Sequence, residues 1–500
     1  MTRKLTRREA IARFGSGAGV LLLAGCGLDA DGKAGLTGST VQAAWVDPSR
    51  EGQLSLGPGE RLISRTDLGR PAEAVAELAR LAHLTDAHVL DASSPARVTF
   101  LDRLGPPFES TFRPHETLTT QVLSGALRAI RQLRPHAVIE GGDLIDNAQS
   151  NELEQALAVL RGARVRPGSG PHGYHGVQLA SNPDSFYYRP DLDAPRHPGL
   201  LTAAVRPFKA AGLSVPWYPV LGDHDALVAG EIAPTPLTRS LSLGDQALWE
   251  LPPDLRVPAR AKLYAAGSPD GPPNVGLVNT FLVEALAGGA VRVPADRSRR
   301  EFDVAEVIAR LRGRSGVGAA GTRLDYHIDF SNKLRMLFLD LVRRDGGSGG
   351  LVAPGQVAWL EDGLATAGDR WVIAVSHQPL TSSEGGEELL ALLDRHPRVI
   401  AAIAGHTHRN SIVARPAPAG GYWLITTASL IDYPQQVRAL RVLETARGVA
   451  VQTWMLDHVS PGQLGLISRE LAYLDAQGGR PQGFAGARTD RNVTLYRDRA

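Results

Sequence analysis

Five short segments that contain Asp and His constrain the fold of this chain more than any other feature. Each segment follows a short, mostly apolar run and pairs its Asp or His with glycine or a turn residue. Runs of this length and composition predict buried strands of a parallel sheet. The segments are Thr85-Asp86-Ala87-His88, Gly142-Asp143-Leu144-Ile145-Asp146-Asn147, Gly222-Asp223-His224-Asp225, Ser376-His377 and Gly405-His406-Thr407-His408.

The expected strands place the five segments at equivalent positions in the fold. In every case the polar group comes directly after the apolar run, and open α/β sheets bind ligands outside the carboxyl ends of their strands. We therefore expect all five segments to bring their side chains to one edge. The runs cover residues 78–84, 137–140, 215–221, 371–375 and 399–404.

The residue types in these segments predict a metal site. Asp-x-His and His-x-His place two side chains where both can reach one ion. A single pair carries little weight, because 14 histidines in 500 residues produce some pairs by chance. Five such segments at one edge supply enough ligands for two divalent cations. Two neighbouring cations can activate a shared water and neutralise phosphoryl oxygens, so the sequence predicts hydrolysis of a phosphate ester.

The order of the segments resembles that of the calcineurin-like metallophosphoesterase superfamily. The resemblance spans roughly residues 78 to 457 and implies a four-layer α-β-β-α sandwich with insertions. Accessory segments at 176–178, 187–191 and 426–430 resemble an exported bacterial subgroup of the actinobacterial type. The sequence departs from the family pattern in one letter, because Asp223 stands where the family usually has asparagine.

The resemblance also implies roles for individual residues. One metal would be held by Asp86, His88 and His408, the other by Asp223, His377 and His406, and Asp143 would bridge the two. A metal-bridging hydroxide would attack a phosphate mono- or diester. His224 would be the general acid for the leaving group, and Asp146 would orient that histidine. A shell of oxygen and imidazole ligands favours manganese, iron, zinc or cobalt over calcium or magnesium.

The aspartate at position 223 changes the charge of the expected site. Three carboxylates, at positions 86, 143 and 223, carry one more negative charge than the family pattern would. We expect this extra charge to strengthen metal retention. It should also make a bridging water less acidic and weaken the attraction for phosphate, because both depend on excess positive charge.

The amino terminus predicts export. Thr6-Arg7-Arg8-Glu9-Ala10-Ile11 resembles a twin-arginine signal, and Leu23-Ala24-Gly25-Cys26 after a short apolar stretch resembles a lipobox. Cys26 is the single cysteine of the chain, so no disulfide can form within it. We expect a lipid anchor at Cys26 on the outer face of the cytoplasmic membrane, with an uncleaved twin-arginine anchor as the alternative. Residues 27–70, rich in Gly, Ser, Asp and Pro, are expected to be a flexible stalk.

The rest of the chain divides around these motifs. Residues 71–460 are expected to form the metallophosphoesterase domain, with insertions at about 165–214 and 226–320 that shape the substrate pocket, and 461–500 a peripheral C-terminal extension. Near-equal numbers of basic and acidic residues, 54 and 52, give no electrostatic reason to expect nucleic-acid binding. The sequence predicts helices at 116–133, 152–161, 356–367 and 467–474, a hairpin at 326–340, and strands at 410–415, 422–427, 437–443 and 449–456.

Two other functions are compatible with parts of the sequence. A β-lactamase-like metallohydrolase would require a compact His-x-His-x-Asp-His cluster, which the sequence lacks. A lipid-anchored surface protein could use the same scaffold to bind metal or ligand without turnover. Retention of His224 beside a full ligand set argues against that alternative, because a binding module has no use for a proton donor. The sequence does not distinguish monoesters, diesters, nucleotides and phospholipid head groups as substrates.

Overall fold

Two mixed sheets form the centre of the protein. The computed structural model describes residues 38–104, 111–264, 270–318, 321–460, 462–478 and 483–499. The first sheet has the strand order β3-β19-β18-β17-β4-β5-β8, and the second has the order β11-β12-β13-β14-β16-β15. The first sheet comprises β3 Ile63–Leu68, β4 Ala74–Leu84, β5 Ala137–Glu140, β8 Trp217–Pro219, β17 Gln436–Thr445, β18 Gly448–Asp457 and β19 Val493–Asp498. The second comprises β11 Tyr326–Ser331, β12 Leu334–Leu339, β13 Trp371–Ser376, β14 Val399–Ala404, β15 Ser411–Arg415 and β16 Tyr422–Thr426.

The side chains of β12 show how the layers are made. Met336 and Phe338 belong to the large core that the second sheet shares with the first. Their neighbours Leu337 and Leu339 point to the other face and pack with α10 (Gln356–Ala365) and α11 (Gly386–Arg395). Alternate residues of a strand face opposite sides of a sheet, so a strand that is apolar throughout must be covered on both faces.

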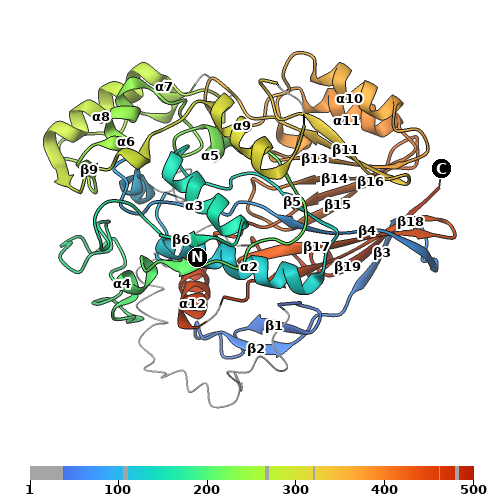
Figure 1. Ribbon diagram of the computed structural model, residues 1–500, viewed down its shortest axis with the longest axis horizontal. Helices are drawn as coiled ribbons and strands as arrows, with labels where there is room; N and C mark the ends of the chain where they lie inside the picture. Colours follow the sequence, from blue (N-terminus) through green and yellow to red (C-terminus); the bar gives the residue numbers. More distant parts are fainter. Residues whose placement is uncertain are drawn as a thin grey trace, which may run out of the picture.

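Helices cover the outer face of the first sheet as well. Helix α2 (Thr119–Leu133) lies against β17 and β18, and α3 (Ser150–Leu160) packs beside it. Figure 1 shows α10 and α11 on one side of the paired sheets and α2 on the other. The predicted α-β-β-α sandwich is therefore confirmed.

The strands after the last histidine motif divide between the two sheets. β15 and β16 extend the second sheet, whereas β17 and β18 return to the first, where β17 pairs antiparallel with β4. The predicted hairpin forms as β11 and β12, with antiparallel pairing from Tyr326 opposite Phe338.

The expected flexible stalk is wrong for residues 38–70. These residues form β1 (Ala43–Val46), β2 (Ser55–Pro58) and β3, and β3 pairs in parallel with β19 from the opposite end of the chain. The C-terminal extension is not peripheral either, because β19 lies between β18 and β3, and Leu495 is fully buried. Both predictions relied on local composition. They are wrong because the strands that pair with these segments are distant in sequence.

The two predicted insertions have their own short elements. The first contains β6 Arg164–Val165, α4 Leu200–Ala204 and β7 Phe208–Lys209. The second contains α6 Pro236–Leu243, β9 Gln246–Leu248, α7 Arg260–Leu263, α8 Val275–Gly289, β10 Ala290–Arg292 and α9 Val304–Ser315. In the described part of the chain, no helix combines the length and apolar character needed to cross a membrane. The predicted signal, the lipobox with Cys26 and residues 27–37 lie outside the described residues.

Candidate metal centre

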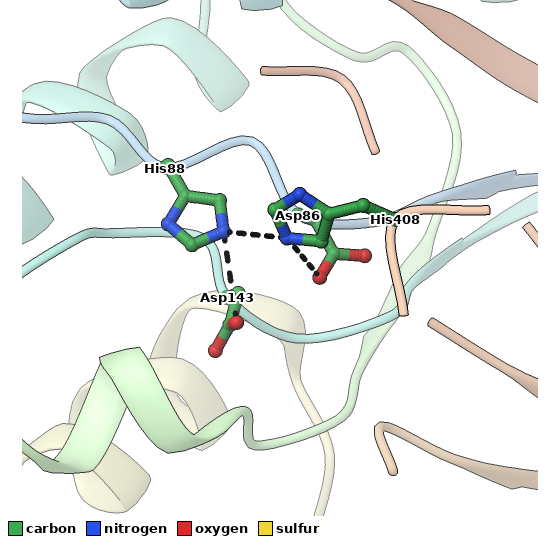
Figure 2. Close-up of side chains that lie close together, drawn as sticks. All are labelled: Asp86, His88, Asp143 and His408. Carbon is green, nitrogen blue, oxygen red and sulfur yellow. Dashed lines mark hydrogen bonds and ion pairs between the residues drawn. The ribbon is translucent and has the colours of Figure 1, made fainter. Parts of the chain in front are cut away.

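The five motifs follow five strands whose carboxyl ends meet, as the sequence predicts. β4, β5 and β8 are adjacent and parallel in the first sheet, and β13 and β14 are adjacent and parallel in the second. The side chains that follow these strands converge between the sheets. Figure 2 shows Asp86 and His88 of one loop pointing toward Asp143 and His408, which come from two other loops.

The converging side chains form two groups that share one residue. Asp86, His88, Asp143 and His408 offer ligand atoms that all lie within 4.8 Å of one another. Asp143 also belongs to a second group, formed with Asp223, His377 and His406, whose ligand atoms likewise all lie within 4.8 Å of one another. His88, Asp146 and His224 form a third group beside them. The structure thus brings together all nine residues that the sequence singles out.

Most of these residues have an unusual backbone conformation. A positive φ angle is uncommon for residues other than glycine and costs of order 1–3 kcal/mol. Five of the seven predicted ligands have it, with φ of 52° at Asp86, 41° at His88, 51° at Asp143, 65° at His406 and 56° at His408. Such strain persists only where the surrounding structure enforces it, and it concentrates at functional sites.

Hydrogen bonds from the protein fix the orientation of three imidazoles. The Nδ1 atom of His88 lies 3.0 Å from Asp146 Oδ1, and that of His408 lies 2.6 Å from Asp432 Oδ2. His377 Nδ1 lies 2.7 Å from the carbonyl oxygen of Gly141. Because these partners are acceptors, each Nδ1 carries the hydrogen, and each Nε2 faces the centre with its lone pair.

Two of these lone pairs face each other directly. His88 Nε2 and His408 Nε2 are 3.2 Å apart, a distance at which two unprotonated nitrogens repel. A proton or a cation between them removes the repulsion. His377 Nε2 is likewise 3.2 Å from both Asp143 Oδ2 and Asp223 Oδ1. The arrangement therefore fits a bound cation at each of the two groups.

The charges of the site also fit bound cations. Among the described residues, Asp86, Asp143 and Asp223 form ion pairs only with histidines. Burial opposes ionisation of Asp86, but the neighbouring imidazoles of His408, His377 and His88 outweigh it and lower the pKa of the carboxyl. Burial also opposes a charge on His408, yet Asp86 and Asp432 raise its pKa to about 9. Buried carboxylates need compensating positive charge, which bound metal ions would supply.

The contacts of Asp146 differ from the predicted ones. Its carboxylate lies 3.8 Å from His224 Nδ1, whereas its backbone carbonyl is 2.8 Å from the same nitrogen. The carboxylate contacts His88 instead and forms a buried ion pair with Arg97. Burial lowers the pKa of His224, but the carboxylates of Asp143, Asp146 and Asp223 outweigh it and raise the pKa. Part of that rise depends on Asp143 and Asp223, whose charge a bound cation would offset.

Several residues that support the site carry no recognisable sequence signal. Asp432 holds His408, and a buried ion pair with Arg113, at 2.7 Å between Nε and Oδ1, holds Asp432 in turn. Gln378 donates a hydrogen bond of 3.1 Å to Asp223 Oδ1. The adjacency of Gln378 to His377 is the one hint that the sequence offers. Asp432 and Arg113 lie in separate loops, and nothing in their spacing links them to the motifs.

The fold and the site define a class of protein before any comparison. A sandwich of two sheets that presents clustered, buried aspartates and histidines at one edge is the framework of a metal-dependent hydrolase. Residues 79–410 match the calcineurin-like phosphoesterase family, and this match covers more than half of the chain. The chain belongs to this dimetal-dependent family.

Comparison with solved structures gives distant similarities. The chain is similar to a dimetal phosphatase from Danio rerio, with 14% identity and a TM-score of 0.41, covering 77% of this chain and 98% of the other. It is also similar to the NAD nucleotidase of Haemophilus influenzae, with 10% identity, a TM-score of 0.26 and coverage of 76% and 50%. A sulfate thiohydrolase of Thermus thermophilus gives 13% identity, a TM-score of 0.30 and coverage of 82% and 61%. Comparison with curated proteins gave no match.

Proposed function

We propose that this chain is a dimetal phosphoesterase that hydrolyses phosphate mono- or diesters. The observation that carries the proposal is the sharing of Asp143 between two groups of ligand atoms, each within 4.8 Å. One carboxylate that belongs to both groups can hold two ions side by side. Asp86, His88 and His408 would complete one ion's protein ligands, and Asp223, His377 and His406 the other's.

The donor set supports the choice of metals. Carboxylate oxygen and imidazole nitrogen suit manganese, iron, zinc or cobalt. When bound, such a pair of ions would supply an activated water and neutralise charge on the phosphoryl oxygens. The protein's own part is to hold the ligands rigidly, and the buried contacts of His88, His377 and His408 serve that purpose.

His224 is the proton donor in this proposal. Its Nδ1 donates to the carbonyl oxygen of Asp146 at 2.8 Å, so Nε2 is the nitrogen available to the cavity that it lines. Its backbone nitrogen donates to Asp143 Oδ1 at 2.9 Å, which holds the residue close to the shared ligand. A proton held at Nε2 can pass to the leaving alkoxide as the ester bond breaks.

The leaving group provides the sharpest test of this role. An alkyl phosphate has a poor leaving group, so His224→Asn should lower kcat by about 100- to 10,000-fold. With p-nitrophenyl phosphate, whose leaving group needs no proton, the loss should be much smaller. Metal content, measured by elemental analysis, should be unchanged in this variant. Equal losses with both substrates would contradict the proton-transfer role.

The metal requirement is tested separately. Wild-type protein and Asp143→Asn are loaded with Mn²⁺, desalted and analysed for bound metal, then assayed with p-nitrophenyl phosphate and bis-p-nitrophenyl phosphate. The proposal predicts two ions per wild-type chain, fewer in the variant, and turnover that follows occupancy. Two bound ions without turnover of any ester would instead favour a binding protein on the same scaffold.

We also propose that the protein is exported and lipid-anchored. The support is the twin-arginine-like segment with Arg7 and Arg8, followed by the lipobox that ends at Cys26. Arg7→Lys with Arg8→Lys should retain the protein inside the cell. Cys26→Ser should release it from the membrane fraction without blocking export. If the Cys26→Ser protein stayed in the membrane fraction at the wild-type level, the lipid anchor would be contradicted.

A further inference from the structure

A cavity of about 450 Å³ opens directly onto the candidate metal centre. Its lining includes residues of the site, among them Asp143, His224 and His406. A volume of this size lies in the range of small-molecule binding sites, and it exceeds what a phosphate group alone occupies. The remainder of the cavity must therefore hold another part of the substrate or water.

Part of the cavity lining is an apolar wall that contains none of the candidate metal ligands. The wall consists of six side chains from two parts of the chain, namely Phe100 and Leu101 of η1 (Thr99–Leu104), Leu241 of α6, and Val278, Phe281 and Leu282 of α8. Phe100, Phe281 and Leu282 are buried, and five of the six belong to one hydrophobic cluster separate from the main core. The second insertion thus supplies most of the wall, and the segment after the first motif supplies the rest.

The cavity lining combines two opposite kinds of chemistry. It includes the carboxylates and imidazoles of the candidate metal centre together with Glu231 and Asp270, whereas the wall presents hydrocarbon and aromatic surface. Water against such a wall is unfavourable, and its displacement by an apolar group stabilises a complex in proportion to the apolar area removed from water. A small polar phosphate ester would leave this surface wet.

We propose that the substrate is a phosphate ester that carries a large apolar group, which lies against this wall while the phosphoryl group lies at the metal centre. This inference rests on the proposed phosphoesterase function and narrows its substrate class. The wall would act as a specificity element. The reacting bond is the same P–O bond that the proposed function cleaves, with water supplying the oxygen to phosphorus and the proton passing to the leaving oxygen.

Helix α8 offers a matched pair of positions for the test. Val278 lines the cavity, whereas Val283, five residues further along the same helix, is 55% exposed and does not line it. Val278→Asn and Val283→Asn make the same change in helix propensity. A difference between the two variants therefore reports on the cavity.

The experiment compares methyl, butyl and octyl phosphate below micellar concentrations, with glucose 6-phosphate as a bulky polar ester. The full-length Mn²⁺-loaded protein is assayed in detergent-free buffer by phosphate release. We expect kcat/KM to rise by about two- to fourfold for each added methylene until the wall is covered. Glucose 6-phosphate should behave like methyl phosphate. Val278→Asn should lower the octyl-to-methyl ratio about tenfold, and Val283→Asn should leave it unchanged.

A binding measurement separates this inference from the proposed function. Octylphosphonate and methylphosphonate cannot be hydrolysed, and calorimetry should show tighter binding of the octyl compound with a negative change in heat capacity. Equal affinities, a flat dependence on chain length, or the same ratio in both asparagine variants would overturn the inference. Preferential octylphosphonate binding without turnover of any ester would support the apolar site and overturn the phosphoesterase assignment instead.

Discussion

Replacement of Asp432 by asparagine tests whether contacts behind the metal centre hold its ligands. The Asp432 side chain is buried and accepts charge-assisted hydrogen bonds from Arg113 and His408. Its Oδ1 lies 2.7 Å from Arg113 Nε, and its Oδ2 lies 3.0 Å from Arg113 Nη2 and 2.6 Å from His408 Nδ1. These three nitrogens are all donors, so the site requires two acceptor oxygens.

An asparagine has one acceptor oxygen in place of two. With the oxygen at the Oδ2 position, the amide nitrogen faces Arg113 Nε, and two donors meet at what was a 2.7 Å hydrogen bond. The bond to His408 survives but loses the negative charge of its acceptor, which weakens it. Breaking a buried ion pair costs about 3–5 kcal/mol of stability because the remaining charge is uncompensated. A lost contact behind a metal ligand lowers metal affinity by about 10- to 100-fold.

Asp457→Asn is the matched control for Asp432→Asn. Asp457 is also buried and pairs with an arginine, at 3.2 Å between its Oδ1 and Arg469 Nη1. Within the described residues its side chain contacts Arg469 and Gln436 and none of the predicted metal ligands. Both variants should lower the free energy of unfolding, measured by denaturant titration. Mn²⁺ affinity, measured by calorimetry, should fall only in Asp432→Asn. The reasoning would be refuted if Asp432→Asn lost stability but kept wild-type Mn²⁺ affinity, or if the two variants lost affinity equally.

Three further changes test other parts of the structure. Gly222→Ala would force a methyl group against the backbone nitrogen and carboxylate of Asp143, so the amount of bound metal should fall. At the control position Gly313 an added carbon meets nothing within 4 Å, and Gly313→Ala should raise the free energy of unfolding by about 0.5–1 kcal/mol. Wild-type metal content in Gly222→Ala would contradict the close approach. Leu495→Ala removes a fully buried side chain of β19 and should cost about 2–5 kcal/mol in denaturant titration, and a cost near zero would mean that the C-terminal strand is dispensable. Burial raises the pKa of the Glu301 carboxyl from 4.5 to about 7. Between these two values the folded state holds a proton that the unfolded state has released, so stability falls as pH rises from 4.5 to 7. Glu301→Gln should remove about 3 kcal/mol of the decrease in unfolding free energy between pH 4.5 and above pH 7, and parallel pH curves for wild type and variant would be inconsistent with the raised pKa.

The parts of the fold that the sequence predicts are those that depend on local pattern. The runs before Asp143 and His406 are short and mostly apolar, and β5 and β14 begin and end at the predicted residues. Convergence of their motifs follows from the rule for parallel strands, which needs no knowledge of the partner. The strands β3 and β19 follow no such rule. They pair through Ile63 and Val493, at opposite ends of the chain, and neither segment is apolar enough to predict a core strand by itself.

The same division holds within the site. The motifs identify the residues that converge, but they cannot tell which atom of a residue makes a contact. Asp146 has two kinds of acceptor, and its carbonyl rather than its carboxylate lies at hydrogen-bond distance from His224. Asp432 supports His408 from a loop that no motif includes. Contacts of this kind depend on how separate loops pack, and single-sequence patterns carry no record of that packing.

One short segment connects the metal centre to the cavity wall. Arg97 forms the buried ion pair with Asp146, which in turn holds His88, and three residues later Phe100 is part of the apolar wall. The distance between the support of the metal centre and this part of the wall is therefore set by a few residues of backbone. Helices α6 and α8 of the second insertion line the remainder of the wall, and none of the predicted metal ligands belongs to either helix. Substitutions there can alter the length or shape of the apolar group that fits without moving the ligand set, which is how one hydrolytic framework can serve esters with different leaving groups.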